Sequence, residues 1–336
     1  MNKTISVCGY IKTGATSVLN FLSEFDDNIV RKKEFQLIRV IDGISDLMYY
    51  FKKGYYVHNS IAIHKFKKHL KNIQKNMSGE TKAQFCAITD AYFKALITSS
   101  WYGATSEIEN YFYPYLKRFW LSRKIIGAVK KAHAIIDKTH KTSNGFPYNE
   151  MYLVNSNFLP ITTEYIENLL KVLGKKDEKN IVLDQFFSSV NPKNEMTFVN
   201  NPLAIVVDRD PRDHYLYHVN NYYRSGTRAI PINDVKDYVL YYKYMRREKS
   251  NFKSDPLILC INFEDMIYKY QETTCKIVDF LGLKNNNKPK SRFDPENYMQ
   301  NTQLFRTHSK HKQDILYIEK ELPEYLYPFE GSNIEQ

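Results

Sequence analysis

Cysteines and long apolar runs are scarce in this sequence. Four of the 336 residues are cysteines, and no two of them form the C-x-x-C pair typical of zinc sites, so we expect no metal. These scattered residues, Cys8, Cys86, Cys260 and Cys275, fit free thiols in a reducing compartment. No run of 18 apolar residues is present, and the opening MNKTISVCGY lacks the pattern of a signal peptide. The chain is therefore predicted to be cytoplasmic, without a transmembrane helix.

Acidic residues are fewer than basic ones. The sequence has 48 Lys and Arg against 37 Asp and Glu, which gives a net charge of +11. A surplus of this size favours polyanionic ligands such as nucleotides, nucleic acids, acidic glycans or anionic lipid headgroups. A general enrichment in lysine explains the surplus equally well, so the charge alone assigns no partner.

A phosphate-binding loop is predicted near the N-terminus. Ile5–Tyr10 is an apolar run of strand length, and apolar residues at helical spacing begin at Val18. Between them, Gly14 lets the backbone turn tightly, and the N–H groups of residues 13–17 would face outward from a helix N-terminus, where anions bind. The polar side chains of this loop are Lys12, Thr13, Thr16 and Ser17.

The residue order in this loop differs from that of nucleoside triphosphatases. Their P-loop is G-x-x-x-x-G-K-[ST], with the lysine after the second glycine, whereas Lys12 stands two residues before Gly14. An ordinary turn between a strand and a helix, with a lysine in it, is the alternative interpretation. This segment alone does not separate the two.

Residues 46–175 are predicted to form a mainly helical insertion, because apolar residues recur there at helical spacing. The expected helices cover about 58–76, 82–98, 106–136 and 162–173. Thr162 or Thr163 would cap the last of them, and Gly174 would end it. Asn144-Gly145 and Pro147 mark a loop before it.

The remaining sequence alternates strands with helices. The expected strands after Ile5–Tyr10 are Val30–Arg39, Ile181–Asp184, Leu203–Val207 and Leu257–Phe263. A helix capped by Asn233 or Asp234 and a helix over Gln271–Leu281, ended by Gly282, follow two of them. Such alternation predicts an α/β fold with a doubly wound, mostly parallel sheet, in which ligands bind beyond the carboxyl ends of the strands.

A second charged turn directly follows the strand Leu203–Val207. It reads Asp208-Arg209-Asp210-Pro211-Arg212-Asp213, and an arginine at such a strand end can hold a phosphate through two hydrogen bonds. The alternative is a turn stabilised by salt bridges among these aspartates and arginines.

Three motifs together resemble the family of sulfotransferases that use 3′-phosphoadenosine 5′-phosphosulfate (PAPS), especially its bacterial branch related to carbohydrate sulfotransferases. They are KTGATS after the first strand, VVDRDPRD after a later one, and INFEDMIYKYQETTCKIVDFLGL near the end. The resemblance covers about 1–45 and 180–285 and implies a P-loop-like α/β nucleotide-binding shell within a single domain, 1–336. Residues 46–175 would then be the acceptor-side insertion, and 286–336 a C-terminal cap and tail.

The resemblance also implies which residues hold the nucleotide. The 5′-phosphosulfate would contact Lys12, Thr13, Gly14, Ala15, Thr16 and Ser17. Arg209 would bind the 3′-phosphate, and Tyr217 stands where the family usually has a serine for the same phosphate. A C-terminal segment in the place of the family's 3′-phosphate loop offers Asn301, Thr302, Gln303 and Arg306.

A general base is needed for the proton of the acceptor hydroxyl. Heparan-type enzymes of the family use a glutamate at the end of the second strand, and Glu34, 22 residues after Lys12, matches that pattern. A surface glutamate paired with a neighbouring lysine is the alternative. Other possible bases are His133 and His140, and Asp184 could orient the acceptor or Lys12.

The resemblance thus implies an enzyme that transfers the sulfuryl group of PAPS to a carbohydrate hydroxyl, such as a unit of a surface polysaccharide or its precursor. The expected partners are PAPS, its product adenosine 3′,5′-bisphosphate (PAP) and a glycan, without nucleic acid or metal. Two alternatives come from other classes. A nucleotide-kinase-like phosphotransferase would need a Walker lysine and a magnesium ligand, and a basic polyanion-binding module would show steep salt dependence.

Overall fold

The computed structural model describes residues 2–103, 105, 107–108, 111, 149–176, 178–225, 229–284, 286, 288–307 and 309–329. The chain divides into two compact units. The first comprises Met1–Gln36 and Gly174–Gln336, and the second comprises Leu37–Leu173.

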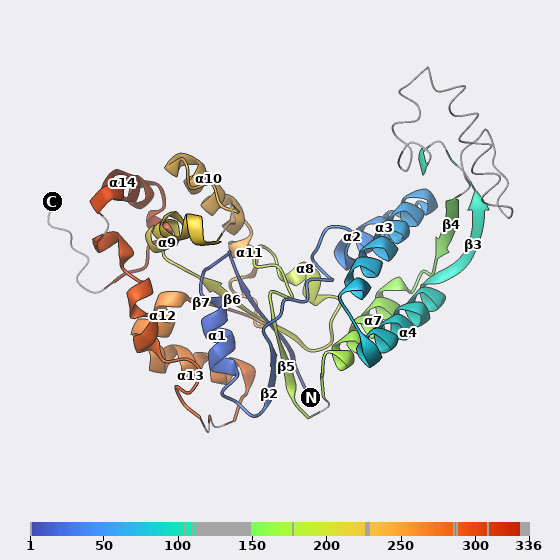
Figure 1. Cartoon of the computed structure of the whole chain (residues 1–336), viewed down its shortest axis with the longest axis horizontal. Coiled ribbons are helices and arrows are strands. Elements are labelled where there is room, and N and C mark those ends of the chain that lie inside the picture. The colour runs from blue at the N-terminus through green and yellow to red at the C-terminus, as the bar shows by residue number, and fades with distance from the viewer. Residues whose placement is uncertain are drawn as a thin grey trace, which may run out of the picture. The chain divides into compact units, whose positions relative to one another are not determined.

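The first unit is built around a five-stranded sheet in the order β2-β5-β1-β6-β7 (Figure 1). Its strands are β1 (Thr4–Gly9), β2 (Asn28–Arg31), β5 (Asn180–Asp184), β6 (Pro202–Asp208) and β7 (Ile258–Asn262), and each neighbouring pair is parallel. The predicted parallel α/β fold is thereby confirmed. The chain runs from β1 to β2 on one side and reaches β6 and β7 on the other, so the loop after β1 lies at a topological switch point, where such sheets bind ligands.

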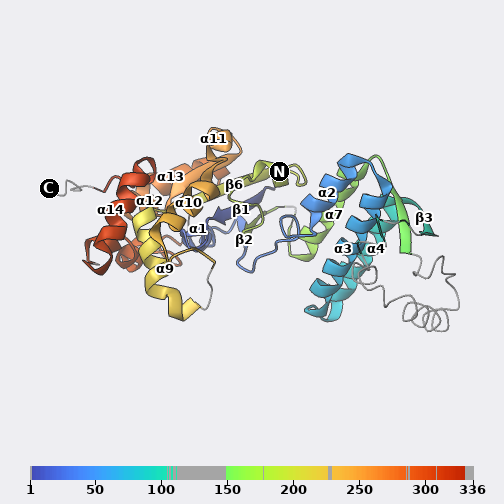
Figure 2. The same ribbon diagram turned by 90° about the horizontal axis from the view of Figure 1, so that it is seen from above.

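Helices cover the sheet, and their apolar side chains pack against those of its strands. Every residue of β1 is buried, as expected for a central parallel strand. Helices α1 (Ala15–Leu22), α12 (Phe263–Tyr268) and α13 (Tyr270–Leu281) share one apolar core with β1 and β6, and they lie together in Figures 1 and 2. The loop between β1 and α1 is therefore anchored at both ends.

A second apolar core lies among three later helices, α9 (Pro211–Ser225), α10 (Val235–Arg246) and α14 (Lys312–Glu321). Helix α9 directly follows β6, so its first turn starts at the carboxyl edge of the sheet. The short helices α8 (Lys193–Met196) and α11 (Lys249–Phe252) and the 3-10 turns η1 (Pro295–Asn301), η2 (Leu304–Arg306), η3 (Ser309–His311) and η4 (Pro323–Tyr325) complete this unit's described elements.

The second unit contains four described helices, α2 (Ile44–Lys53), α3 (Tyr56–Lys75), α4 (Gly79–Leu96) and α7 (Phe158–Val172). The helices expected over 58–76 and 82–98 are confirmed as α3 and α4. This unit also holds an antiparallel pair of strands, β3 (Ile97–Gly103) and β4 (Asn149–Val154), within the stretch expected to be mainly helical. Most of the helix expected over 106–136 and the loop at 144–147 lie outside the described residues.

The boundaries predicted for two of the elements are wrong. The strand expected over Val30–Arg39 begins earlier and ends at Arg31, because Arg31 pairs with Leu183 and β5 ends one residue later. Helix α7 starts at Phe158 rather than after Thr162, whose hydroxyl instead bonds to the Phe158 carbonyl (2.7 Å) within the helix.

Two other boundary predictions, the end of α7 and the start of α10, are confirmed. Gly174, with φ +98°, follows the end of α7, and the side chain of Asp234 caps α10 by accepting the N–H of Lys236. Among the described helices, none is both long and apolar enough to span a membrane.

Candidate functional site

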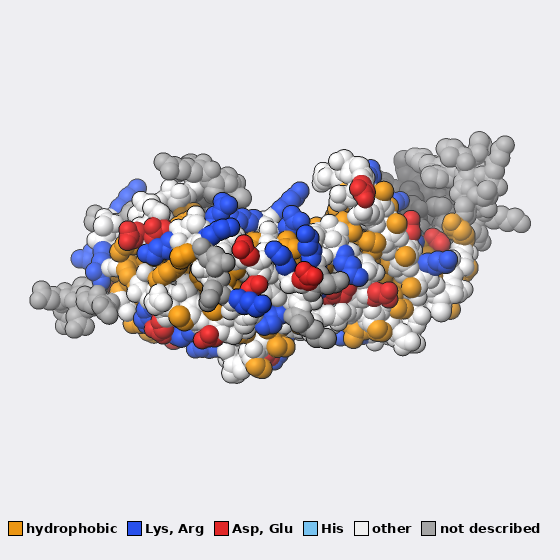
Figure 3. All heavy atoms as spheres, turned by 90° about the horizontal axis from the view of Figure 1, so that it is seen from below, with side chains coloured by type: hydrophobic (Ala, Val, Ile, Leu, Met, Phe, Trp, Pro, Cys, Tyr) orange, Lys and Arg blue, Asp and Glu red, His pale blue; other side chains and the backbone are white. Residues whose placement is uncertain are grey.

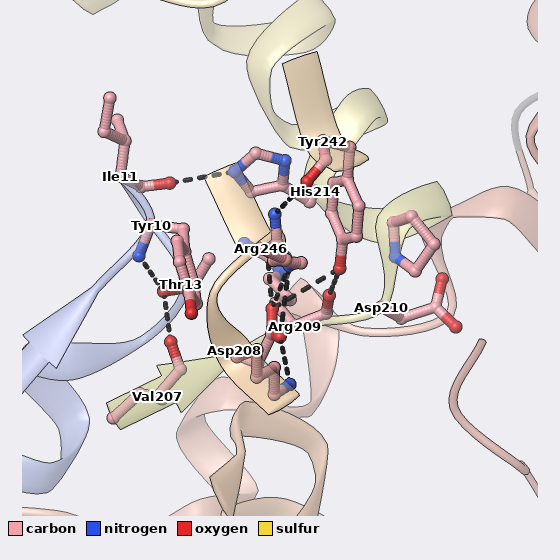
Figure 4. A network of polar contacts seen from close by, with 12 residues as sticks. Tyr10, Ile11, Thr13, Val207, Asp208, Arg209, Asp210, His214, Tyr242 and Arg246 are labelled. Atoms are coloured by element: carbon pink, nitrogen blue, oxygen red, sulfur yellow. Dashed lines mark hydrogen bonds and ion pairs between the residues drawn. The ribbon is translucent and has the colours of Figure 1, made fainter. Parts of the chain in front are cut away.

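The loop between β1 and α1 is fixed by one buried hydroxyl. The Thr13 hydroxyl accepts the N–H of Tyr10 (3.0 Å) and donates to the carbonyl of Val207 on β6 (2.7 Å), as Figure 4 shows. Because this side chain is buried and engaged within the fold, Thr13 would offer a ligand its backbone N–H rather than its hydroxyl.

Gly14 allows the turn into α1. Its φ of +100° is one that side chains other than glycine rarely adopt, and a Cβ built there would lie 2.4 Å from Cδ2 of Phe263. The backbone at Gly14 therefore lies directly against the start of α12. Only glycine fits this position.

The first turn of α1 carries the remaining predicted phosphate ligands. Lys12 and Thr16 are exposed, whereas Ala15 and Ser17 are buried. The first turn holds no acidic residue, and the first N–H groups of a helix generally lack a partner within it. Here the N–H of Ser17 bonds to the Gly14 carbonyl (2.9 Å). This end of α1 can therefore attract an anion, and the exposed ammonium of Lys12 adds a positive charge beside it.

Arg209 connects the loop after β1 with the C-terminal segment. Its guanidinium donates through Nη1 to the carbonyl of Lys12 (3.2 Å) and through Nη2 to the carbonyl of Asn301. The rings of Tyr217 and Phe263 lie 4.9 and 5.3 Å from the guanidinium carbon. Tyr217 therefore meets Arg209 through its ring face, which is attractive to a cation.

The carboxylates of the turn pair with cations other than Arg209. Asp208 accepts hydrogen bonds from Arg246 (2.6 Å) and Lys249 (2.6 Å), and Asp210 accepts one from Arg212 (2.7 Å). Burial raises the pKa of Asp208, but the charges of Arg246 and Lys249 outweigh it and leave that pKa below its usual range. The alternative of a salt-bridged turn thus holds for Asp208 and Asp210, whereas Asp213 accepts backbone N–H groups and Arg209 donates to carbonyls.

One donor of Arg209 has no partner within the described chain. Its Nε is buried and makes no hydrogen bond among the described residues. An unpaired buried N–H of a guanidinium costs free energy, which an anionic ligand would recover. This orphaned donor is the feature of the turn that fits a phosphate.

Two buried acids lie beside Arg209. Glu264 accepts the N–H of Asp210 (2.9 Å), and burial followed by the charge of Asp210 raises its pKa well above the usual range. Burial, then Asp210, raises the pKa of Asp213 to about 6, although Arg209 and two backbone N–H groups lower it. Both shifts favour the uncharged forms of these two acids beside Arg209.

The C-terminal segment contacts the turn that carries Arg209. Asp213 accepts the backbone N–H groups of Gln303 and Leu304, both at 2.7 Å, and the Gln303 side chain donates to the hydroxyl of Tyr268 (2.8 Å). Asn301 contributes its carbonyl to Arg209 rather than its amide. Thr302 is buried and Arg306 is exposed.

Glu34 lies beyond the end of the edge strand β2. It is exposed, and its carboxylate accepts a hydrogen bond from Gln36. The neighbouring Phe35 stacks on Phe186, which follows β5, at 6.1 Å between ring centroids. This contact keeps the segment near the carboxyl edge of the sheet, where Asp184 ends β5. His133 and His140 lie outside the described residues.

Two histidines of α9 belong to the site and were not predicted. His214 is fully buried and its Nε2 lies 2.9 Å from the Ile11 carbonyl. His218, one turn further, has a buried Nε2 without a hydrogen-bond partner among the described residues. Burial lowers the pKa of His218 to about 4; the Ile11 carbonyl opposes this, while Arg209 and Lys12 add to it. The i, i+4 spacing of the two histidines after the DRDPRD turn was the available signal.

The described residues include no group of three or more His, Cys, Asp or Glu side chains placed to hold a metal ion. On the face drawn in Figure 3, basic and acidic side chains are interspersed. The net charge of the chain is therefore not gathered there into a patch free of acids.

No protein-family model and no curated protein matches the sequence. Similar solved structures include the sulfotransferase domain of the Synechococcus PCC 7002 olefin synthase (TM-score 0.42, 11% identity, covering 97% of this chain and 96% of that one). A sulfotransferase from Mycobacterium avium is also similar, with a TM-score of 0.42 and 13% identity over 98% of this chain and 77% of that one. Retinol dehydratase in complex with androsterone and the inactive cofactor PAP has a TM-score of 0.36 and 14% identity over 97% of this chain and 82% of that one. TM-scores this low support no inference about activity. An activity can be proposed only from the residues of the site.

Proposed function

We propose that this protein is a PAPS-dependent sulfotransferase. The observation that carries the proposal is the hydrogen bond from Arg209 to the carbonyl of Lys12. It brings together two segments, 197 residues apart in sequence, that the family resemblance assigns to the 3′-phosphate and the 5′-phosphosulfate. Both lie at the carboxyl edge of the sheet, beside its switch point.

The residues of the site suit a nucleotide with phosphates at both ends. The 5′-phosphosulfate would lie at the start of α1, against the N–H groups of Thr13 to Thr16 and the ammonium of Lys12. The N–H of Ser17 bonds to the Gly14 carbonyl (2.9 Å), so Ser17 would contact the ligand only through its hydroxyl. The 3′-phosphate would take the orphaned Nε of Arg209. Because Arg209 is only 4% exposed and is covered by the carbonyl of Asn301, the segment that carries Asn301 would move aside on binding.

Sulfuryl transfer forms a bond from the acceptor oxygen to sulfur and breaks the bond from sulfur to the bridging oxygen. The electron pair of the broken bond goes to the 5′-phosphate of PAP, where Lys12 would stabilise the developing charge. The proton of the acceptor hydroxyl goes to Glu34, which is exposed and able to receive it. No metal takes part in this scheme.

The acceptor is proposed to be a carbohydrate hydroxyl, as in the branch of the family that the motifs resemble, and the reaction to take place in the cytoplasm. The acceptor side would come from the insertion predicted over residues 46–175. A neutral glycan would be selected by hydrogen bonds to its hydroxyls.

The experiment is PAP binding to the wild type, Arg209→Ala and Arg292→Ala, measured by calorimetry. Arg292 is an exposed arginine of the same unit, so its loss changes the net charge equally. We expect Arg209→Ala to weaken PAP binding by about 1.5–3 kcal/mol, as for a hydrogen bond to a charged group. Equal affinity of all three proteins would show that the turn is purely structural.

A further inference from the structure

Two consecutive residues in the loop after β1 have left-handed backbone conformations. Ile11 has φ +64° and Lys12 has φ +58°, and neither is glycine. This conformation is unfavourable for residues with a Cβ, and most of all for a β-branched one such as Ile11. Such strain persists only where the surroundings impose it.

Two buried side chains from the β6–α9 segment impose it. Arg209 donates to the carbonyl of Lys12 (3.2 Å), and His214 donates to the carbonyl of Ile11 (2.9 Å). Each carbonyl belongs to a rigid peptide plane, and the two planes flank the α-carbon of Lys12. Fixing both planes fixes φ and ψ of Lys12, and with them the direction in which its side chain leaves the backbone.

The imidazole of His214 is itself held in one orientation. A carbonyl only accepts, so the proton of the neutral ring lies on Nε2, and Nδ1 faces the hydroxyl of Tyr238 at 2.9 Å. That hydroxyl also lies 2.7 Å from the Pro211 carbonyl, so it has two possible acceptors for one proton. Burial lowers the pKa of His214 well below its usual range, and His218, Arg246 and Arg209 add to this, whereas the hydrogen bond to the Ile11 carbonyl opposes it.

We infer that His214 is a positioning residue for the reaction proposed above: it holds the Ile11 peptide so that the ammonium of Lys12 is aimed at the bridging oxygen. It does not touch the nucleotide in this scheme. Figure 4 shows its ring pointing to Ile11 from α9. The same helix follows directly from Arg209, so the two phosphate-binding segments are aligned by one rigid element.

Two variants separate this role from simple packing. In His214→Gln the side-chain amide can reach as far as Nε2 and donate to Ile11. In His214→Asn the shorter amide reaches only the position of Nδ1, near Tyr238. The measurements are amide hydrogen exchange of the unliganded protein in peptides covering 9–17 and 270–281, and the rate and KM of PAPS hydrolysis to PAP and sulfate, with water as the acceptor.

For His214→Asn we expect about tenfold faster exchange in 9–17 but not in 270–281, as for one lost buried hydrogen bond. We also expect about a 10–100-fold lower kcat with a smaller change in KM, because misplacement of a catalytic group acts on turnover. His214→Gln should stay within about threefold of the wild type in both. Equal behaviour of the two variants, or exchange that rises alike in both peptides, would overturn the inference. The exchange result needs no ligand, so failure of the wild type to bind PAP would refute the proposed function separately.

Discussion

Replacing Gly14 by alanine tests the geometry on which the nucleotide site depends. The new Cβ would lie 2.4 Å from Cδ2 and 2.8 Å from Cγ of Phe263, distances that real Cβ atoms do not show, so the ring or the loop must shift. The left-handed φ of +100° adds about 1–2 kcal/mol of backbone strain, and overpacking adds about 1–3 kcal/mol. Gly14→Ala should therefore destabilise the protein by about 2–5 kcal/mol.

The shift should also reach Arg209. Phe263 is buried, and its ring lies 5.3 Å from the Arg209 guanidinium, so displacement of the ring disturbs the 3′-phosphate side together with the loop. PAP affinity should fall with stability, and Phe263→Leu in the Gly14→Ala background should restore part of both.

The matched control is Gly282→Ala in the same compact unit. Gly282 also has a positive φ, +59°, but the atom that its Cβ would approach is the flexible end of Lys3, at 3.3 Å. This variant carries the backbone strain without the clash, and should cost about 1–2 kcal/mol. The assay is the free energy of unfolding in denaturant, with calorimetric titration of PAP. If the two glycine variants lost equal stability, or Gly14→Ala bound PAP normally, the described packing of the loop on α12 would be wrong.

Three further predictions concern the charged groups of the site. Glu34→Gln should keep PAP affinity but lower sulfuryl transfer to a glycan acceptor about 10²–10⁴-fold, measured with radiolabelled PAPS. His133→Ala and His140→Ala should stay near wild type in the same assay. A Glu34→Gln enzyme as active as the wild type would exclude Glu34 as the base. Lys12→Ala should reduce kcat more than PAP affinity, since leaving-group charge develops in the transition state, and equal losses in both would contradict this role. The pKa of His218 is about 4 in the fold against 6.5 when unfolded, so it favours the folded state above pH 6.5 and that contribution is lost as the pH falls toward 4. Unfolding free energies of His218→Gln should thus depend less on pH over this range, by up to about 1.4 kcal/mol per pH unit, and parallel curves would refute the burial of this ring.

The central strands and their loops were predictable because local sequence determines them. IVLD and LAIVV are buried on both faces, so they stand out as apolar runs, and β5 and β6 are found there. The edge strand was predicted too long, since the length of β2 depends on where its partner β5 ends. Propensity within VRKKEFQLIR contains no information about that partner.

Sequence motifs pointed to the candidate residues of the site but not to the hydrogen bonds that these residues make. Lys12 and Arg209 were chosen from motifs, and the structure brings Arg209 to the Lys12 carbonyl. The partners of Asp208 come from α10 and from Lys249, about forty residues further on, which no local pattern reveals. The left-handed conformation of Ile11 was equally hidden, because an isoleucine after an apolar run predicts extended backbone.

The most direct test of the central claim is which nucleotide the wild-type protein binds. PAP at a hundredfold excess over its dissociation constant should raise the free energy of unfolding by about 2.7 kcal/mol, because it binds the folded state alone. AMP and ATP at equal concentration lack the 3′-phosphate that Arg209 would hold, so they should stabilise the protein much less. Stabilisation by ATP equal to that by PAP, and strengthened by magnesium, would contradict the sulfotransferase account and support a phosphotransferase.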